Sequence, residues 1–378
     1  MVDAARLKWS WAEAAAYGDQ VPLFFYSTLF LEHPETREMF PISMAAQRDR
    51  LVTALGRIVS DVDNVDALVP FLQQLGRDHR KFAVLDGHYP AVGSALLATL
   101  EHFLGGDWTP DLAADWEAAY GIVAQVMSEA ANDSAKESPA WWEAEVVAHE
   151  RRTIDLAVLR VAPHERLDYV PGQSLTIEHP NRPRMWRQYS PANAPREDGT
   201  IDFHVRMADA GQVSPALVEL TQPGDTLCIG PPLGTGLRLP DTPPRHVLML
   251  AGGTGLAPLK AIAEQIAHDY DGRQVYLYWG TRHHRDLYDL PALRDFAGRH
   301  DWFHIVPSVA EGEQTQTVHK GNPVGIALRQ ARWLECDVFV CGPPGMVAQS
   351  VSALAHAGVP ERQIHREEFN GTGEEAPA

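Results

Sequence analysis

The spacing of apolar residues changes twice along this chain of 378 residues, so a single type of secondary structure cannot bury them all. Up to residue 132 the spacing is helical, because apolar residues recur at steps of three and four in 89–103 and again in 112–126. Thr109 and Pro110 precede the second series and suit an N-cap and a first helical position. We predict an all-α domain over residues 1–135.

The second pattern is an alternation of apolar and polar residues, which is typical of strands with one buried face. It begins after a polar stretch at 132–139 that we interpret as a linker. The alternating segments are short, and Asp198-Gly199 is a turn signal before the last of them. These segments are 145–149, 156–161, 174–178 and 201–207. The pattern predicts an antiparallel β-barrel over residues 140–242.

The third pattern consists of fully apolar segments that are separated by stretches long enough for a helix. The segments are 247–251, 275–279, 303–307 and 338–341. Alternation of buried strands with helices predicts an α/β domain with a doubly wound parallel sheet, which we place at residues 243–370. We expect residues 371–378 to be a disordered tail.

Charge and cysteine content restrict the partners and the compartment. The formal net charge is −18, from 50 acidic and 32 basic residues, which disfavours nucleic acid and anionic membrane surfaces. Three cysteines cannot form a paired disulfide framework. The first residues lack an apolar secretory core, and glycine and proline interrupt the longest uncharged run, 246–259. We expect a cytoplasmic monomer without nucleic-acid partners or integral membrane association.

Two glycine-rich turns directly follow apolar strands of the predicted α/β domain. Glycines at the end of a parallel strand let the phosphates of a ligand approach backbone N–H groups and the next helix. Neither turn has the three-glycine dinucleotide fingerprint, which disfavours an ordinary Rossmann dehydrogenase, and either turn alone is also compatible with a mere tight turn. The candidate binding residues are Gly252, Gly253, Thr254, Gly255, Leu256 and Ala257 in the first turn, and Cys341, Gly342 and Pro343 in the second.

Polar residues of the barrel suit a flavin dinucleotide, because a cation can meet phosphate, an aromatic face can meet a ring, and a hydroxyl can meet ring nitrogens. These residues are Arg187, Gln188, Tyr189 and Ser190, followed by Gln212, Val213 and Ser214. Taken separately, each is compatible with an ordinary surface strand. In this order, upstream of the two glycine turns, they resemble the ferredoxin-reductase family. The resemblance implies FAD in the barrel, a nicotinamide nucleotide in the α/β domain, and Phe369 as the aromatic residue that covers the flavin.

The helical domain contains a histidine, His79. It follows Phe25-Tyr26, Phe40 and Gln47 and precedes Tyr89, Trp116 and Tyr120. A single histidine there is also compatible with a core or surface role. With its surroundings, it resembles the globin domain of the flavohemoglobins, and the resemblance then spans almost the whole chain. It implies haem b with His79 as the proximal iron ligand, Phe40 packed against the haem, Tyr26 and Gln47 as distal hydrogen-bonding residues, and Leu51 as their apolar neighbour.

Two positions near His79 depart from the family pattern. Flavohemoglobins usually place a Tyr and a Glu behind the proximal histidine; Tyr89 matches the first, and Asp133 stands where we place the second. We therefore expect Asp133 either to hold the imidazole weakly or to be a solvated residue at the helix end. Asp78 stands where the family often has Lys, which on the resemblance places a negative charge near the approach between flavin and haem.

The resemblance implies a nitric oxide dioxygenase. Hydride from NADH or NADPH would pass to FAD, single electrons would pass to haem, and ferrous haem would bind O2, which converts nitric oxide to nitrate. A reductase of O2 or peroxide and a haem-based oxygen or redox sensor are the alternatives. The choice between NADH and NADPH stays open: Arg282 and Arg285 follow the strand where the adenosine ribose should lie, yet a similar turn occurs in NADH-using reductases.

Overall fold

The computed structural model describes residues 2–208, 211–234, 236–240 and 243–369, and the predicted tail at 371–378 lies outside them. The chain divides into two compact units, of which the first ends at Ala140 and the second begins at Trp141. One apolar core fills the first unit, whereas the second has a core in its barrel and one on each face of its parallel sheet.

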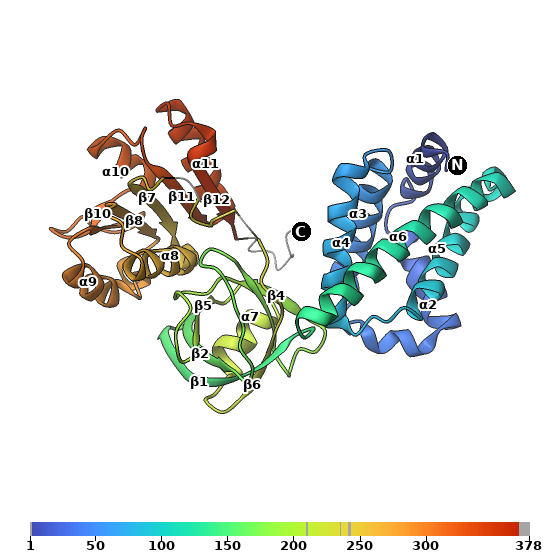
Figure 1. Cartoon of the computed structure of the whole chain (residues 1–378), viewed down its shortest axis with the longest axis horizontal. Helices are drawn as coiled ribbons and strands as arrows, with labels where there is room; N and C mark the ends of the chain where they lie inside the picture. Colours follow the sequence, from blue (N-terminus) through green and yellow to red (C-terminus); the bar gives the residue numbers. More distant parts are fainter. Residues whose placement is uncertain (1, 209–210, 235, 241–242, 370–378) are drawn as a thin grey trace. The chain divides into compact units, whose positions relative to one another are not determined.

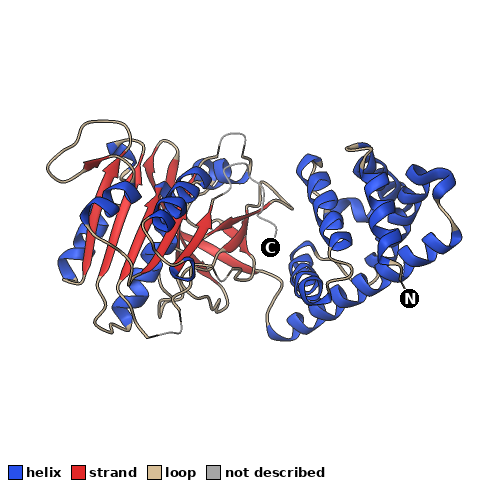
Figure 2. Cartoon of the chain, turned by 90° about the horizontal axis from the view of Figure 1, so that it is seen from above, coloured by secondary structure: helices blue, strands red, loops and turns tan. Residues whose placement is uncertain are grey.

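The first unit is entirely helical in the residues described, as predicted (Figure 2). Its α-helices are α1 (Ala4–Ala15), α2 (Gln20–Glu32), α3 (Ala45–Ser60), α4 (Val65–His79), α5 (His88–Leu104) and α6 (Pro110–Glu137), and its short 3-10 turns are η1 (Pro34–Met39), η2 (Arg80–Phe82) and η3 (Gly105–Asp107). Leu7, Leu29, Leu100 and Trp116 are buried where α1, α2, α5 and α6 meet.

Helix α6 begins where the sequence predicted and ends later. The Thr109 hydroxyl accepts a hydrogen bond from the Leu112 N–H at 3.2 Å, and Pro110 is the first helical residue. The expected linker at 132–139 is wrong over most of its length, because α6 continues to Glu137. Polar residues are tolerated on the exposed side of a helix, and the helix stops just before Pro139, which disfavours helical backbone in the preceding residue.

The second unit begins with an antiparallel sheet of six strands in the order β4-β3-β6-β1-β2-β5. The strands are β1 (Trp142–Thr153), β2 (Leu156–Pro163), β3 (Leu175–Glu178), β4 (Trp186–Tyr189), β5 (Ile201–Arg206) and β6 (Thr226–Ile229). An isolated bridge between Pro191, two residues after β4, and Phe203 of β5 connects the two ends of the sheet and closes it into a barrel. The short helix α7 (Val213–Pro215) and the π-helical turn η4 (Ala216–Leu220) follow β5, and Val213, Leu217 and Val218 belong to the barrel core.

The parallel sheet has the order β10-β9-β8-β7-β11-β12 (Figure 1). Its strands are β7 (Val247–Gly252), β8 (Val275–Thr281), β9 (Phe303–Val309), β10 (His319–Lys320), β11 (Asp337–Gly342) and β12 (Ile364–Glu368), and four of them match the predicted apolar segments. Helices α8 (Leu256–His268) and α9 (Leu290–Arg299) cover one face, and α10 (Pro323–Gln330) and α11 (Pro344–His356) cover the other. The chain runs outward from β7 to β10 and then returns to β11 on the other side of β7, so β7 and β11 flank the switch point where α/β sheets bind ligands.

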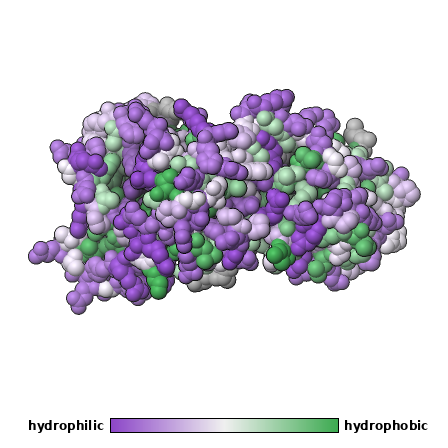
Figure 3. Space-filling model, turned by 90° about the horizontal axis from the view of Figure 1, so that it is seen from below, coloured by the Kyte–Doolittle hydropathy of each residue, from purple (hydrophilic) through white to green (hydrophobic). Residues whose placement is uncertain are grey.

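Exposed apolar side chains are dispersed over the surface. Figure 3 shows hydrophobic residues interspersed with hydrophilic ones on the face that it draws. Leu31, Ile42 and Ile154 are the most exposed large apolar residues. Among the residues described, none of the helices has the length and apolar character needed to cross a membrane.

Candidate functional site

His79 ends helix α4, and the same helix fixes its ring. The Nδ1 atom lies 2.7 Å from the backbone carbonyl oxygen of Leu75, one turn earlier. Because a carbonyl oxygen only accepts, Nδ1 carries the proton and Nε2 keeps its lone pair. Burial lowers the pKa of His79 below its ordinary value, so the imidazole is neutral at neutral pH. These properties suit a ligand of haem iron.

Asp133 does not hold this imidazole. Its carboxylate accepts a hydrogen bond from Lys136 Nζ at 2.7 Å, and its side chain is 74% exposed. Leu75, rather than Asp133, is the partner of Nδ1. The expected role of Asp133 is therefore corrected to that of a solvated residue near the end of α6, which was the alternative interpretation.

We expect Asp133→Asn and Asp133→Glu to leave the haem midpoint potential unchanged. Neither substitution alters the hydrogen bond between His79 and Leu75, and an exposed carboxylate acts only weakly at a distance through solvent. A potentiometric titration of both variants beside the unaltered chain measures the effect. A displaced midpoint in either variant would show that the carboxylate reaches the imidazole after all.

Tyr89 lies at the start of α5, in a network that joins α5 to α6. The Tyr120 hydroxyl donates to the Tyr89 carbonyl oxygen at 2.6 Å. Asp86, in the preceding loop, accepts hydrogen bonds from Ser128 and from Asn132, the latter at 3.3 Å. Burial, assisted by the charge of Asp86, raises the pKa of the Tyr89 phenol, so the hydroxyl stays protonated at neutral pH.

The negative charge expected from Asp78 is paired. Its carboxylate lies 3.0 Å from Lys81 Nζ, and the Lys81 side chain is only 1% exposed. A buried ammonium group requires such a partner. The pair spans the end of α4 and the turn η2, so it also fixes the backbone on both sides of His79.

Tyr26 contacts two of the other residues that were expected around the haem, Phe40 and Gln47. Its ring is 5% exposed and meets the Phe40 ring at 5.4 Å between centroids, nearly edge to face. Its hydroxyl donates to the Gln47 carbonyl oxygen over 3.4 Å, which is long for a hydrogen bond. Burial raises the pKa of Tyr26, so the phenol remains a donor at neutral pH. Leu51 lies one helical turn after Gln47 on α3 and packs at the margin of the same core.

The residues of the helical unit fit a haem group. A neutral imidazole offers its Nε2 lone pair, and the hydrogen bond that a buried phenol makes among the described residues is long, at 3.4 Å. Several large apolar side chains at the core margin are only partly covered, which suits contact with an apolar ring. They include Phe30, Phe40, Leu51, Leu55 and Val92.

The second unit contains a cleft of about 1440 Å³ between the barrel and the parallel sheet. It collects most of the residues expected to bind flavin and nucleotide. Those in its wall are Arg187, Gln188, Tyr189, Ser190, Gln212, Val213, Ser214, Gly252, Gly253, Thr254, Ala257, Pro343 and Phe369. The Ser190 side chain is 5% exposed, and its hydroxyl has no hydrogen-bond partner among the described residues. A buried hydroxyl without a partner in the wall of a cleft suits a ligand with hydrogen-bonding ring atoms.

Four expected residues lie behind this wall rather than in it. Leu256 and Cys341 are fully buried. A Cβ atom on Gly255 would lie 2.2 Å from the carbonyl oxygen of Cys341, and one on Gly342 would lie 3.0 Å from the Cα of Gly252. These two glycines therefore allow the turns after β7 and β11 to approach each other closely, which is a packing role.

Several residues of the cleft were not selected from the sequence. Glu367 lies two residues before Phe369, and burial raises its pKa to about 7. His204 and Arg206 come from β5, where the alternation with barrel-core residues identifies the outward positions. Arg152 lies in β1, close to its end. The alternation of apolar and polar residues in β5 does show which side chains point out of the barrel. It does not show that these side chains line the cleft, because that depends on where the neighbouring domain lies.

Replacing Arg187 with Ala should weaken FAD binding. The side chain lies in the cleft, and loss of a charge-assisted hydrogen bond to phosphate costs about 1.5–3 kcal/mol, roughly a tenfold to hundredfold change in affinity. Flavin fluorescence titration of the variant measures it. The control is Arg166→Ala, because Arg166 is a barrel arginine that pairs with Asp168 on the surface. Equal FAD affinity in both variants would refute the placement of Arg187.

Three known families match successive parts of the chain. Residues 23–127 match the globin family, residues 142–236 match the oxidoreductase FAD-binding domain, and residues 249–352 match the oxidoreductase NAD-binding domain. The flavohemoprotein of Bordetella parapertussis is 29% identical over 384 residues, which cover 94% of each chain. The flavohemoprotein of Bacillus subtilis is 23% identical over 375 residues, which cover 93% of each.

A solved structure has the same fold over nearly its whole length. The flavohemoglobin of Malassezia yamatoensis, with bound FAD and haem, superposes with a TM-score of 0.76 at 18% identity, and the match covers 97% of this chain and 98% of that one. The Amycolatopsis cytochrome P450 reductase GcoB matches 61% of this chain and 71% of its own, at 30% identity and a TM-score of 0.57.

The fold and the two sites define a haem-binding globin that is joined to a reductase for FAD and a nicotinamide nucleotide. Nearly the whole chain is similar to flavohemoproteins, which combine a globin domain with FAD-binding and NAD-binding oxidoreductase domains in the same order. Its expected fold class, an all-α globin followed by an antiparallel FAD domain and a doubly wound nucleotide domain, is confirmed.

Proposed function

We propose that this chain oxidises nitric oxide to nitrate with O2, using electrons from NADH or NADPH. The observation that supports this most directly is the buried Tyr26 hydroxyl, which among the described residues hydrogen-bonds to the Gln47 backbone carbonyl oxygen over a long 3.4 Å. A buried donor with so weak a partner favours a small ligand that carries partial negative charge. The same chain contains a cleft that suits a flavin and a nucleotide. Together the two sites suit a reaction of O2 that uses electrons from a nicotinamide nucleotide.

The residue roles follow from this proposal. His79 would bind the iron through Nε2, with Leu75 holding the ring, and Phe40 and Leu51 would pack around the haem. Arg187 would meet the pyrophosphate of FAD, Ser190 its ring system, and Phe369 would cover the ring. When bound, haem supplies a site for O2, and FAD divides the two electrons of a hydride into single-electron steps.

Electron balance determines the nicotinamide requirement. Conversion of nitric oxide to nitrate releases three electrons, whereas reduction of O2 consumes four. Each nitric oxide therefore needs one further electron, and one NADH or NADPH, a two-electron donor, supports two nitric oxide molecules. The products are two nitrates, one oxidised nicotinamide and one proton.

The proposal retains the three predicted domains, at 1–135, 140–242 and 243–370, and a cytoplasmic location. Cys228, Cys336 and Cys341 are free thiols in the described structure. O2 and nitric oxide are the proposed gaseous substrates.

An oxygen and nitric oxide electrode experiment tests this function. The haem- and FAD-loaded chain should consume nitric oxide rapidly only when both O2 and NADH or NADPH are present. Omission of either should reduce consumption to the rate seen without protein. If nicotinamide oxidation under air is equally fast with and without nitric oxide, and no nitrate forms, the chain is an O2 reductase instead.

A further inference from the structure

Strand β5 of the barrel directs polar side chains toward the nucleotide domain. Ile201, Phe203 and Val205 of β5 lie in the barrel core, so the alternate residues of the strand point outward. Of these, His204 Nδ1 lies 2.9 Å from the Tyr288 hydroxyl oxygen, and the two groups form a hydrogen bond. Arg206 pairs with Asp286 at 3.5 Å. Both partners lie between β8 and α9 in the nucleotide domain.

From Tyr288 the contacts continue to the glycine turn that lines the cleft. The Tyr288 ring meets the Trp279 ring at 5.4 Å, edge to face. The Trp279 indole N–H donates to the Gly253 carbonyl oxygen at 2.9 Å. Gly253 has a φ of +54°, so this turn has a backbone that few other residues would adopt. A continuous series of contacts thus joins strand β5 of the barrel to the turn expected to hold the nucleotide.

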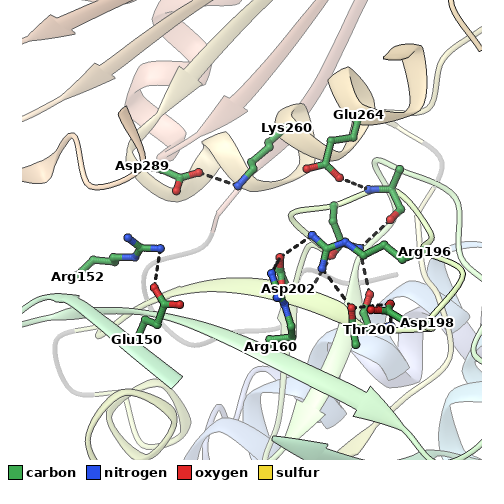
Figure 4. Close-up of polar contacts among 12 residues, drawn as sticks. Glu150, Arg152, Arg160, Arg196, Asp198, Thr200, Asp202, Lys260, Glu264 and Asp289 are labelled. Atoms are coloured by element: carbon green, nitrogen blue, oxygen red, sulfur yellow. Dashed lines mark hydrogen bonds and ion pairs between the residues drawn. The ribbon is translucent and has the colours of Figure 1, made fainter. Parts of the chain in front are cut away.

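Neighbouring contacts define the interface around this series (Figure 4). On the nucleotide side, Glu264 of α8 accepts a hydrogen bond from the Ala194 N–H of the barrel at 3.1 Å. Lys260 of the same helix pairs with Asp289 at 2.8 Å. Burial, assisted by the charge of Lys260, lowers the pKa of His204 to about 3, so its ring is neutral. The bond to Tyr288 is therefore a hydrogen bond between neutral groups.

We propose that the His204–Tyr288 hydrogen bond is a positioning contact that sets the rate of hydride transfer between the nicotinamide nucleotide and FAD. It rests on the reductase half of the proposed function. In that step the C4–H bond of the nicotinamide breaks, its electron pair and hydrogen pass to N5 of the flavin, and the nicotinamide is oxidised while the flavin is reduced. Such a transfer needs close contact between two rings, and a displacement of about 1 Å can slow a reaction by about 100-fold. Two domains hold those rings, so a contact between the domains controls their separation.

Tyr288→Phe tests this contact, because it removes the hydroxyl and keeps the ring that packs on Trp279. The matched control is Tyr278→Phe. Tyr278 is a buried tyrosine of the same domain that hydrogen-bonds to Gln330 at 2.7 Å, and neither residue lines the cleft. Anaerobic stopped-flow reduction of the FAD-loaded chain by NADH gives the limiting rate and the apparent affinity separately. We expect Tyr288→Phe to lower the limiting rate about tenfold with little change in affinity, and Tyr278→Phe to leave it unchanged.

His204→Leu and the double variant complete the test. If both residues act through one bond, His204→Leu should slow the reaction as Tyr288→Phe does, and the double variant should be no slower than either. Equal limiting rates in Tyr288→Phe, Tyr278→Phe and the unaltered chain would overturn the proposal, as would multiplicative losses in the double variant. If Tyr288→Phe does not retain FAD, the limiting rate of flavin reduction in His204→Leu tests the proposal instead: a normal rate would overturn it. The assay contains neither O2 nor nitric oxide, so its outcome is independent of whether nitric oxide is the substrate.

Discussion

His79→Ala should purify without haem and with a full complement of FAD. The imidazole Nε2 is the only group that we assign to the iron, and its loss removes the bond that anchors the haem. FAD binds in the second unit, and every described residue that lines its cleft belongs to that unit. Reduction of the flavin by NADH should therefore continue at the normal rate.

Haem content from the pyridine haemochrome spectrum and flavin content from fluorescence measure this result together. His102→Ala is the control, because His102 is an exposed histidine of the same unit that stacks on Phe24. The control should retain haem. Stoichiometric haem in His79→Ala, with a red-shifted or unchanged Soret band, would place the iron ligand elsewhere.

Tyr26→Phe should release O2 faster from the reduced, haem-loaded chain without loss of haem. The substitution keeps the ring that packs on Phe40 and removes the hydroxyl, which burial keeps protonated at neutral pH. Hydrogen bonds to charged or partly charged groups contribute about 1.5–3 kcal/mol, so the dissociation rate should rise roughly tenfold or more. Flash photolysis or stopped-flow mixing measures that rate.

The control for this variant is Tyr17→Phe, because Tyr17 is a half-exposed tyrosine of the same unit whose ring contacts Phe103. It should leave O2 dissociation unchanged. An unchanged rate in Tyr26→Phe as well would mean that the Tyr26 hydroxyl serves only its hydrogen bond to Gln47.

The parts of the fold that the sequence predicted are those with strong local signals. The start of α6 follows from Thr109 and Pro110, and the long apolar strands of the parallel sheet follow from their composition. Strand β6 was missed because its four residues are too few to establish a period of two, whereas the equally short β3 was predicted because Ser174 extends its alternation to five residues. The end of α6 was placed too early because polar composition was interpreted as loss of helix, although exposed helical residues are ordinarily polar.

In the candidate site too, the features with a local sequence signal were predicted and those without one were not. Residues next to each other in sequence, such as those from Arg187 to Ser190, do share one wall of the cleft. The partner of His79 was not predictable from the family pattern, since the Leu75 carbonyl belongs to the backbone and leaves no side-chain signal. The His204–Tyr288 contact joins residues 84 positions apart in different domains, and only the folded chain brings them together.

The ratio of nitrate formed to nicotinamide consumed tests the proposed reaction most directly. The haem- and FAD-loaded chain is supplied with limiting NADH or NADPH, excess O2 and repeated additions of nitric oxide, and nitrate and oxidised nicotinamide are measured at completion. We expect two nitrates for each nicotinamide oxidised, because each nitric oxide requires one electron beyond those it releases. A ratio near zero, with O2 consumed as the nicotinamide is oxidised, would contradict the proposed function and assign the chain to O2 reduction.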